Sequence, residues 1–416
     1  MTLVSELQLP AFDYTEPSLR GERFHAAMAA LSRQGWLAQG PFGYIVLDRH
    51  AGEFFLRTRA AIFPGMKIAE IFDVRQGPLY EQMQRNILHV NGSDHARLRS
   101  LLNPALSPRA VERYRPAVRQ FMQELWDDVA ARSSRSDGAV QCEFVDDFAK
   151  PLPSLLIATV MGAPLEDAPR LHHWSNWIQR QFDAVSMATE RQLIEKAVDE
   201  FYAYAQELLR VRREQPRDDL ISSLIQAEQA GERLSDVECI NLVFNVLAGG
   251  VDTTQSQLAH AVRLLAEHPQ QWQLLVDDPS LADAAVEEAL RFEPITPFTA
   301  RITTEDVQYR DVTFPEGTIV LVCAFTGNRD LADDATQPAG EPDVFDISAQ
   351  RDRARPLTFG AGVHYCVGAN LARLELREAL AFLAQRARKL ELAGPPQFEG
   401  ITGIYGLARL PLAFTP

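Results

Sequence analysis

The stretch FGAGVHYCVG, residues 359–368, sets a single cysteine, Cys366, among three glycines and a histidine. A buried structural cysteine behaves as a small hydrophobe, so a simple core position does not require glycines at 360, 362 and 368. The pattern therefore indicates a ligand site. An alternative is a cysteine nucleophile with His364 as its base, although residues two apart rarely face each other productively.

The chain has 416 residues, of which 46% are hydrophobic and 23% are charged, so it can bury a large core in one or two domains. Its four cysteines are scattered, without a CxxC pair or zinc-type spacing, which favours a reducing, cytoplasmic setting. The first 24 residues contain neither a signal-peptide core nor a span of about 20 apolar residues, so we expect a soluble protein. A formal net charge of -15 disfavours general binding to nucleic acid or acidic membranes.

Helical periodicity covers most of the chain, while the segments 43–48, 317–325 and 407–414 are typical of strands. The clearest helix begins at Ser235, which has capping-box spacing to Glu238, and it continues to His268 before Pro269 stops it. We therefore expect a mainly α protein with a small β region.

The middle of this long helix reads AGGVDTT, residues 248–254, and is its weakest part. Gly249 and Gly250 each cost roughly 1 kcal/mol against alanine in a helix interior. One explanation is close helix packing over glycine. The other is that the helix opens there, because a threonine hydroxyl can bond back to the i−4 carbonyl and the missing side chains leave room for a ligand.

The segment VEEALRF contains Glu288 and Arg291 at i, i+3 on a predicted helix, and such a pair by itself is typical of the surface. Its position between AGGVDTT and FGAGVHYCVG is more informative. In this order, the three motifs resemble those of the cytochrome P-450 family of haem-thiolate monooxygenases. The last motif matches the family pattern FGxGxHxCxG at every defined position, and the resemblance covers most of the chain.

This resemblance implies the family's fold, a triangular, mainly α single domain over residues 1–416, with a long central helix and a small β region. It implies haem b (iron protoporphyrin IX), with Cys366 as the iron ligand. A thiolate ligand supplies electron density that favours O–O cleavage, and the glycines let the backbone approach the porphyrin and sulfur. A helix starting near Val367 would direct its dipole at the sulfur.

Other family positions match residues that hold the haem or the fold around it. Two buried propionates need charge-assisted donors, for which an arginine fork is well suited. The ExxR pair, Glu288 and Arg291, has a structural role by the same resemblance. The implied haem contacts are Phe359 over the proximal ring face, Gly368, and the propionate ligands His95, Arg99, Arg301 and His364.

Asp252 and Thr253 match the acid-alcohol pair of the family's oxygen-binding helix. Bound dioxygen needs two protons, and a hydroxyl backed by a carboxylate can position that relay, with general acid–base assistance typically worth roughly 10² to 10⁴ in rate. The alternative for Thr253 is a threonine that only bonds back to its own helix. The pair argues against the peroxide-using relatives, which commonly have an arginine and a proline there.

The substrate pocket is expected to have an apolar bias that suits a medium-sized lipophilic compound. Asn245 lies where relatives usually carry an apolar residue, so its amide either binds a polar substrate group or packs within the helix. The sequence NGSDH at 91–95 replaces the common DPPEH, but Asn91 and Gly92 can still make the turn. The expected pocket walls are 77–90, 172–186, Asn245, Ala248, Gly249, Ile295, Thr296 and Phe298.

Two arginine-rich segments stand out in this acidic chain, one over 95–120 and the other at 351–355. They are either solvated surface or a docking face for an acidic ferredoxin, reduced in turn by an NAD(P)H-dependent reductase. The chain leaves no length for a fused electron donor, so a separate partner is expected, and the protein itself is expected to be a monomer.

The expected reaction inserts one atom of O₂ into a small or medium organic substrate, with C–H hydroxylation as the default. Epoxidation, dealkylation, desaturation and oxidative coupling remain open alternatives. Two alternatives of other classes are a non-catalytic haem sensor or binding protein and a helical protein without haem.

Overall fold

The computed structural model describes residues 1–133, 139–229, 234–330, 341–349 and 355–416. The chain forms two compact units. Unit 1 contains Met1–Pro64, Ala284–Cys366 and Phe398–Gly406, and unit 2 contains Gly65–Asp283, Val367–Gln397 and Leu407–Pro416. The cysteine motif therefore closes a segment of unit 1, whereas AGGVDTT lies within unit 2.

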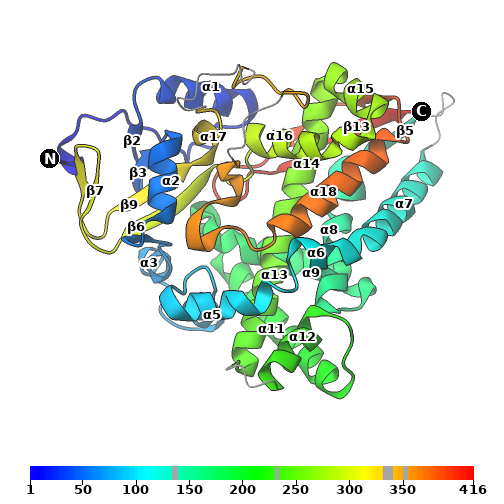
Figure 1. The fold of residues 1–416 in the computed structure, drawn as a ribbon, viewed down its shortest axis with the longest axis horizontal. Helices are drawn as coiled ribbons and strands as arrows, with labels where there is room; N and C mark the ends of the chain where they lie inside the picture. The colour runs from blue at the N-terminus through cyan, green and yellow to red at the C-terminus, as the bar shows by residue number, and fades with distance from the viewer. Residues whose placement is uncertain (134–138, 230–233, 331–340, 350–354) are drawn as a thin grey trace. The chain divides into compact units, whose positions relative to one another are not determined.

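Unit 1 is built on a five-stranded sheet in the order β2-β3-β9-β6-β4. Strands β3 and β9 are parallel, and the other neighbouring strands are antiparallel. Helix α2 (Arg49–Arg57) lies along the sheet (Figure 1), where its Phe55 and Leu56 share a core cluster with valines of β3 and β9. The strands are β2 (Leu37–Gly40), β3 (Gly43–Val46), β4 (Ala61–Ile62), β6 (Phe298–Thr303) and β9 (Ile319–Cys323).

The described part of unit 1 also contains short strands and several helices. A second sheet has the order β1-β8-β7. Its strands are β1 (Thr2–Leu3), β7 (Val307–Tyr309) and β8 (Val312–Phe314). The helices are α1 (Gly21–Ser32), α2 (Arg49–Arg57), α16 (Ala282–Phe292), whose first two residues belong to unit 2, and α17 (Ala324–Gly327).

Unit 2 is mainly helical, with one three-stranded sheet of order β10-β13-β5. Its strands are β5 (Val140–Glu143), β10 (Lys389–Leu392) and β13 (Pro411–Thr415), and two further short strands are β11 (Gln397–Phe398) and β12 (Leu407–Arg409). The first helices are α3 (Met66–Ile71), α4 (Pro78–Arg85), α5 (Gly92–Leu102), α6 (Pro108–Val111), α7 (Arg115–Arg132) and α8 (Pro151–Met161). The others are α9 (Ala168–Gln179), α10 (Ala184–Thr189), α11 (Arg191–Glu214), α12 (Leu220–Gln229), α13 (Asp236–Gly250), α14 (Asp252–Glu267), α15 (Pro269–Asp277) and α18 (Ala369–Ala384).

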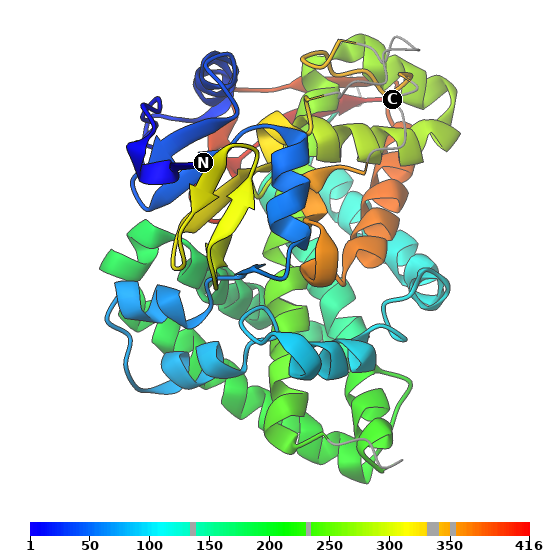
Figure 2. The same ribbon diagram turned by 60° about the vertical axis from the view of Figure 1, so that its left-hand side comes forward.

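The long predicted helix is present as α13 and α14, which run end to end (Figure 2). Ser235 caps α13, and the reciprocal bonds of a capping box with Glu238 are both formed. The helix ends at His268, and Pro269 begins α15. Between the two halves, Val251 leaves the helical pattern, so the helix is interrupted inside the predicted AGGVDTT segment.

The mainly α fold with a small β region is confirmed, with local differences. The predicted strand 317–325 ends at Cys323, and the chain continues directly into α17. The helix after the cysteine motif begins at Ala369, two residues later than expected. Among the described residues, no helix combines the length and the apolar character that crossing a membrane requires.

Candidate functional site

The loop that leads to Cys366 is held in place by the side chain of Asn328. The Leu357 N–H donates to Asn328 Oδ1 at 2.6 Å, and Asn328 Nδ2 donates to Thr358 Oγ1 at 3.0 Å. Thr358 Oγ1 in turn donates to the Leu290 carbonyl at 2.6 Å. The Cys366 N–H then donates to the Phe359 carbonyl at 3.0 Å, which closes the loop. Backbone and side-chain bonds therefore fix where the cysteine emerges.

Glycine occupies two positions of this loop for different structural reasons. Gly360 has φ +69°, and a Cβ there would meet no described atom within 4 Å, so the backbone is bare on an open side. Gly362 has φ +71°, and its Cβ would come 2.5 Å from the Leu56 carbonyl oxygen of α2. Gly362 is therefore needed for packing on α2, and the approach of Gly360, Gly362 and Gly368 to a porphyrin stays a prediction.

The other three cysteines are poor thiolate candidates. Burial raises the pKa of Cys239 to about 12, and it also raises the pKa values of Cys142 and Cys323. Burial therefore disfavours the thiolate form at these three positions, and iron ligation requires a thiolate. Cys366 is only partly buried and lies beside the open position of Gly360.

The ExxR pair is buried, not exposed as such spacing usually indicates. Glu288 and Arg291 are 5% and 6% exposed, and two bonds of 2.8 Å join the guanidinium to the carboxylate. Arg291 also donates to the carbonyls of Pro342 and Val344, while Glu288 Oε1 accepts from the Asp346 N–H. Because the pair fastens α16 to the 342–346 segment, its role in the described structure is architectural.

Arg301 of β6 tests whether a propionate fits this chain. Its side chain is 3% exposed, and desolvation lowers its pKa to about 10. It donates to the Ala300 carbonyl at 2.8 Å, and it forms no ion pair with any residue that the structure describes. A buried guanidinium without a carboxylate is costly, so an anionic ligand such as a haem propionate fits Arg301.

His95 and Arg99 lie one turn apart on α5, on the same side of the helix. His95 is buried, and its pKa is lowered by burial and by the nearby charge of Arg99. The Asn91–Gly92 turn forms as predicted, with Asn91 at the N-cap and Gly92 at φ +64° as the first residue of α5. His364 is half-buried in a 3₁₀ turn, Gly362–His364, just before Cys366. These residues present donors that suit an anion.

At the break between α13 and α14, one glycine serves close helix packing and the other leaves open space, so each of the two explanations holds for one residue. A Cβ at Gly250 would overlap the Ile157 side chain of α8, so this position serves close helix packing. A Cβ at Gly249 would meet no described atom within 4 Å, so this position leaves space. Thr253 Oγ1 donates to the Gly249 carbonyl at 2.5 Å, as the back-bonding interpretation predicts.

Helix α9 contributes polar contacts to this break that sequence reasoning missed. Ser175 Oγ lies 3.3 Å from the Leu247 carbonyl oxygen and 3.2 Å from Asp252 Oδ2, and Gln179 Nε2 donates to the Ala248 carbonyl. The expected apolar wall at 172–186 is therefore polar where it meets α13 and α14. The sequence signal for these contacts was the presence of polar residues at 172, 175 and 179, which share one face of the helix.

The expected substrate residues make contacts within their own units. Asn245 Nδ2 donates to the Asn241 carbonyl at 2.6 Å, which accounts for the amide nitrogen by a bond within α13. Ile295 is buried, and its carbonyl accepts from the Tyr405 N–H at 2.7 Å. Phe298 packs its ring 5.3 Å from that of Tyr14, and Ala248 is buried while Thr296 is half-buried.

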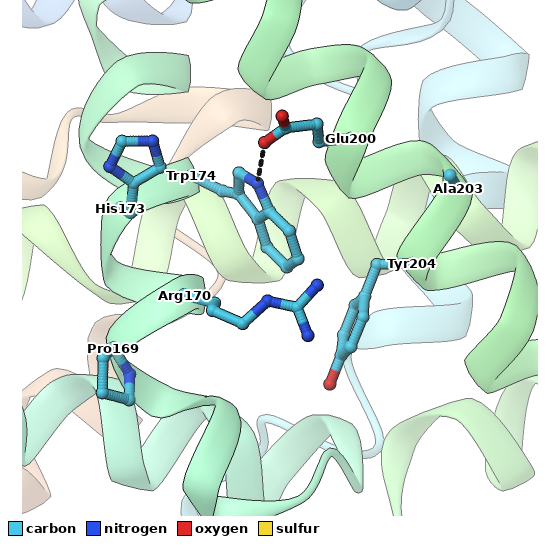
Figure 3. A pocket seen from close by; sticks show the side chains of 7 residues that line it. All are labelled: Pro169, Arg170, His173, Trp174, Glu200, Ala203 and Tyr204. Atoms are coloured by element: carbon cyan, nitrogen blue, oxygen red, sulfur yellow. Dashed lines mark hydrogen bonds between the residues drawn. The ribbon is translucent and has the colours of Figure 1, made fainter.

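A groove of about 620 Å³ lies between α9 and α11, and of the residues predicted for substrate it is lined only by His173 and Trp174 of the expected wall 172–186. Figure 3 shows the Arg170 guanidinium between the rings of Trp174 and Tyr204. Trp174 Nε1 donates to Glu200 at 3.0 Å, and Arg170 and Tyr204 both bond Asp167. Its polar groups are satisfied within the chain, so we assign no ligand to the groove.

The arginine-rich segment 95–120 is compensated by acids from distant parts of the sequence. Arg113 pairs with Asp218 at 2.7 Å, Arg97 pairs with Glu238, and both Arg115 and Arg119 pair with Glu378. Arg109 is exposed and forms no ion pair within the part of the chain that the structure describes.

The second arginine-rich segment is described only from Arg355 onward. Arg351 and Arg353 lie outside the described residues, and Arg355 is exposed. The docking face predicted from both segments stays a prediction, and within 95–120 it contains Arg97, Arg113, Arg115 and Arg119 as paired charges.

Known proteins share both the sequence and the fold. The sequence model of the cytochrome P450 family matches residues 68–390. The luteothin monooxygenase of Streptomyces thioluteus is 32% identical over 98% of this chain and 96% of its own length. The mycinamicin IV hydroxylase/epoxidase of Micromonospora griseorubida is 35% identical over 76% of this chain and 75% of its own length.

Among solved structures, that of CalO2 superposes with a TM-score of 0.87 at 31% identity, covering 98% of this chain and all of that one. P450BioI, solved with an acyl carrier protein carrying a fatty acid, has a TM-score of 0.82 at 28% identity and covers 94% of this chain and 99% of its own. The chain belongs to the bacterial cytochrome P450 family, whose members bind haem iron and act as monooxygenases.

Proposed function

We propose that Cys366 supplies the thiolate that binds the haem iron, within one domain that comprises the whole chain. The observation that carries this assignment is the fixed loop of residues 357–366, in which Asn328 and the Phe359 carbonyl set the position of the cysteine. The raised pKa values of the other three thiols support the same choice. When bound, the haem supplies dioxygen activation and two-electron oxidation of the substrate.

The chain's own donors bind and orient this group. Arg301 is buried without an acidic partner among the described residues, so it binds one propionate, and His364 lies on the loop beside the ligand. His95 and Arg99 supply a second donor pair from α5. Phe359 would pack against the haem, and Gly368 keeps the backbone bare at the start of α18.

Asp252 and Thr253 would hold and pass the protons that dioxygen activation consumes. Thr253 holds its hydroxyl in the break of the long helix, bonded to the Gly249 carbonyl. Asp252 is nearly fully buried beside it, with Ser175 at hydrogen-bond distance from Oδ2. A hydroxyl that accepts a proton from one neighbour while donating its own is a suitable relay.

Removing the Thr253 hydroxyl is expected to uncouple the reaction. The Thr253→Ala variant should bind haem and substrate normally but divert most reducing equivalents to hydrogen peroxide, with product formation lowered by roughly 10². The measurement is the ratio of peroxide released to O₂ consumed. Thr253→Ser is the matched control because it keeps the hydroxyl, and well-coupled turnover by Thr253→Ala would disprove the relay.

The proposed reaction is hydroxylation of a C–H bond in a small or medium lipophilic compound. The support is the family's general activity and two relatives, one named a monooxygenase and one named a hydroxylase/epoxidase. A compound library screened for the spin-state change that accompanies displacement of the iron-bound water identifies candidate substrates. Product analysis by mass spectrometry then separates hydroxylation from epoxidation, desaturation or coupling.

We also propose that a monomer receives electrons from an acidic ferredoxin, reduced in turn by an NAD(P)H-dependent reductase. The support is the arginine-rich surface of 95–120, on which Arg109 has no ion pair among the described residues. Exposed unpaired charges contribute most to steering of an oppositely charged partner.

Charge reversal at two arginines distinguishes an arginine that steers the ferredoxin from one whose charge is neutralised by an ion pair within the chain. Arg109→Glu should slow reduction by ferredoxin at low ionic strength about tenfold, because it removes an unpaired positive charge. Arg113→Glu should have a smaller effect, because Asp218 already neutralises that guanidinium. The measurement is the reduction rate against salt concentration, and a rate that ignores both salt and Arg109→Glu contradicts ferredoxin steering at this surface.

A further inference from the structure

His172 of α9 lies between solvent and the buried Asp252 carboxylate. Its side chain is 22% exposed, whereas that of Asp252 is 7% exposed. His172 Nε2 lies 2.9 Å from Gln255 Oε1 and 3.9 Å from Asp252 Oδ1. One face of α9 thus brings an ionisable ring next to the carboxylate, while Ser175 on the same face contacts the other carboxylate oxygen.

The contacts define how the ring can handle a proton. Gln255 Oε1 is an acceptor, so Nε2 carries the hydrogen in the bond between them. The distance of 3.9 Å to Oδ1 is too long for a hydrogen bond, and a small rotation of the ring or the carboxylate closes it. The Nε2 proton can therefore move between two acceptors, the Gln255 amide and the Asp252 carboxylate.

We propose that His172 is the positioning residue that links Asp252 to solvent and resupplies its proton. The ring gains one proton from water, and its Nε2 proton passes to Asp252 Oδ1. The ring is then neutral with its hydrogen on Nδ1, proton exchange with solvent returns it to the Nε2–H form, and the carboxylate holds the proton that the relay delivers. This inference rests on the proposed role of Asp252 and adds the route by which that acid is reprotonated.

The groups around His172 set the pH range in which its ring gains a proton. Burial lowers the pKa of His172 below its usual 6.5, Lys150 and His173 lower it further, and Gln255 and Asp146 raise it. The ring is therefore mainly neutral at pH 7 and gains charge as the pH falls. An imidazolium next to Asp252 should bring the carboxylate and the ring together, so resupply of the proton should improve at acid pH.

Histidine NMR of the holoenzyme tests the linkage without turnover. In the reduced, CO-bound protein, which is diamagnetic, the ring of His172 is titrated in wild type and in Asp252→Asn. Loss of the carboxylate should lower the His172 pKa by about one unit, because an opposite charge within 4–6 Å favours the charged form. The His173 ring serves as the internal control, since it lines the α9–α11 groove (Figure 3). An unchanged His172 pKa in Asp252→Asn overturns the inference.

A pair of neighbouring variants then tests the consequence for turnover. With a substrate from the spin-state screen, His172→Gln should raise the peroxide fraction severalfold and abolish its fall toward acid pH. His173→Gln should keep the low peroxide fraction and its fall toward acid pH, with the profile shifted at most slightly to higher pH because His173 lowers the His172 pKa. Equal profiles for the two variants overturn the role of His172, whereas the role of Asp252 is judged separately by the peroxide fraction of Asp252→Asn.

Discussion

Replacing Cys366 by serine is expected to abolish the haem-thiolate state and all oxygenation. A serine hydroxyl is not deprotonated at neutral pH, so it cannot donate the electron density that favours O–O cleavage. The fixed loop should still form, because its bonds run through Asn328, Thr358 and the backbone of Cys366, none of which needs the sulfur. The measurement is the CO-difference spectrum of the reduced protein, in which the thiolate band should be lost.

Cys142→Ser is the matched control for this substitution. Cys142 is also partly buried, but burial and the nearby Asp147 and Glu143 raise the pKa of its thiol, which excludes it as a thiolate. The control variant should keep the thiolate band and full activity. A thiolate band in Cys366→Ser would assign the iron to another residue and remove the basis of the proposed function.

Removing Arg291 is expected to be among the most destabilising single substitutions in the chain. Arg291→Ala leaves the Glu288 carboxylate buried without its guanidinium partner, and it also leaves the Pro342 and Val344 carbonyls without that donor. Breaking a buried ion pair on one side costs about 3–5 kcal/mol, a large share of the 5–15 kcal/mol typical of a folded protein. We expect a much lower unfolding midpoint and poor haem incorporation, measured by denaturant titration and by haem content per chain.

An exposed pair with the same spacing provides the comparison. Lys67 and Glu70 also stand at i, i+3, but both are exposed, and surface pairs of this kind contribute at most about 1 kcal/mol. Lys67→Ala should therefore leave stability and haem content nearly unchanged. If Arg291→Ala behaved like Lys67→Ala, the architectural role assigned to the ExxR pair would be wrong.

Local signals allowed much of the fold and of the candidate site to be predicted from sequence. The Ser235–Glu238 capping box and Pro269 bound the long helix because both act through bonds within a few residues. The weak centre of that helix was also predictable, because glycine and threonine lower helix stability wherever they occur. The assignment of Cys366 as the iron ligand came from the resemblance of its motif to that of a known family.

Features that depend on distant partners could not be predicted from sequence. The i, i+3 spacing of Glu288 and Arg291 says nothing about burial, which depends on the 342–346 segment. The acids that neutralise Arg113 and Arg119 stand more than a hundred residues away in the sequence. His172 and Asp252 are 80 residues apart, and only the packing of α9 on α14 brings them together.

The two glycines at the break of the long helix imply different freedom for evolution and for engineering. Saturation mutagenesis at position 250 should return almost only small residues, because Ile157 occupies the space that any side chain needs. Position 249 faces no such barrier from the described chain, so a library there can vary the shape of the site while the scaffold survives. Of these two adjacent glycines, Gly250 preserves the packing of the helix, and Gly249 is the position at which substitutions can give new substrate selectivity.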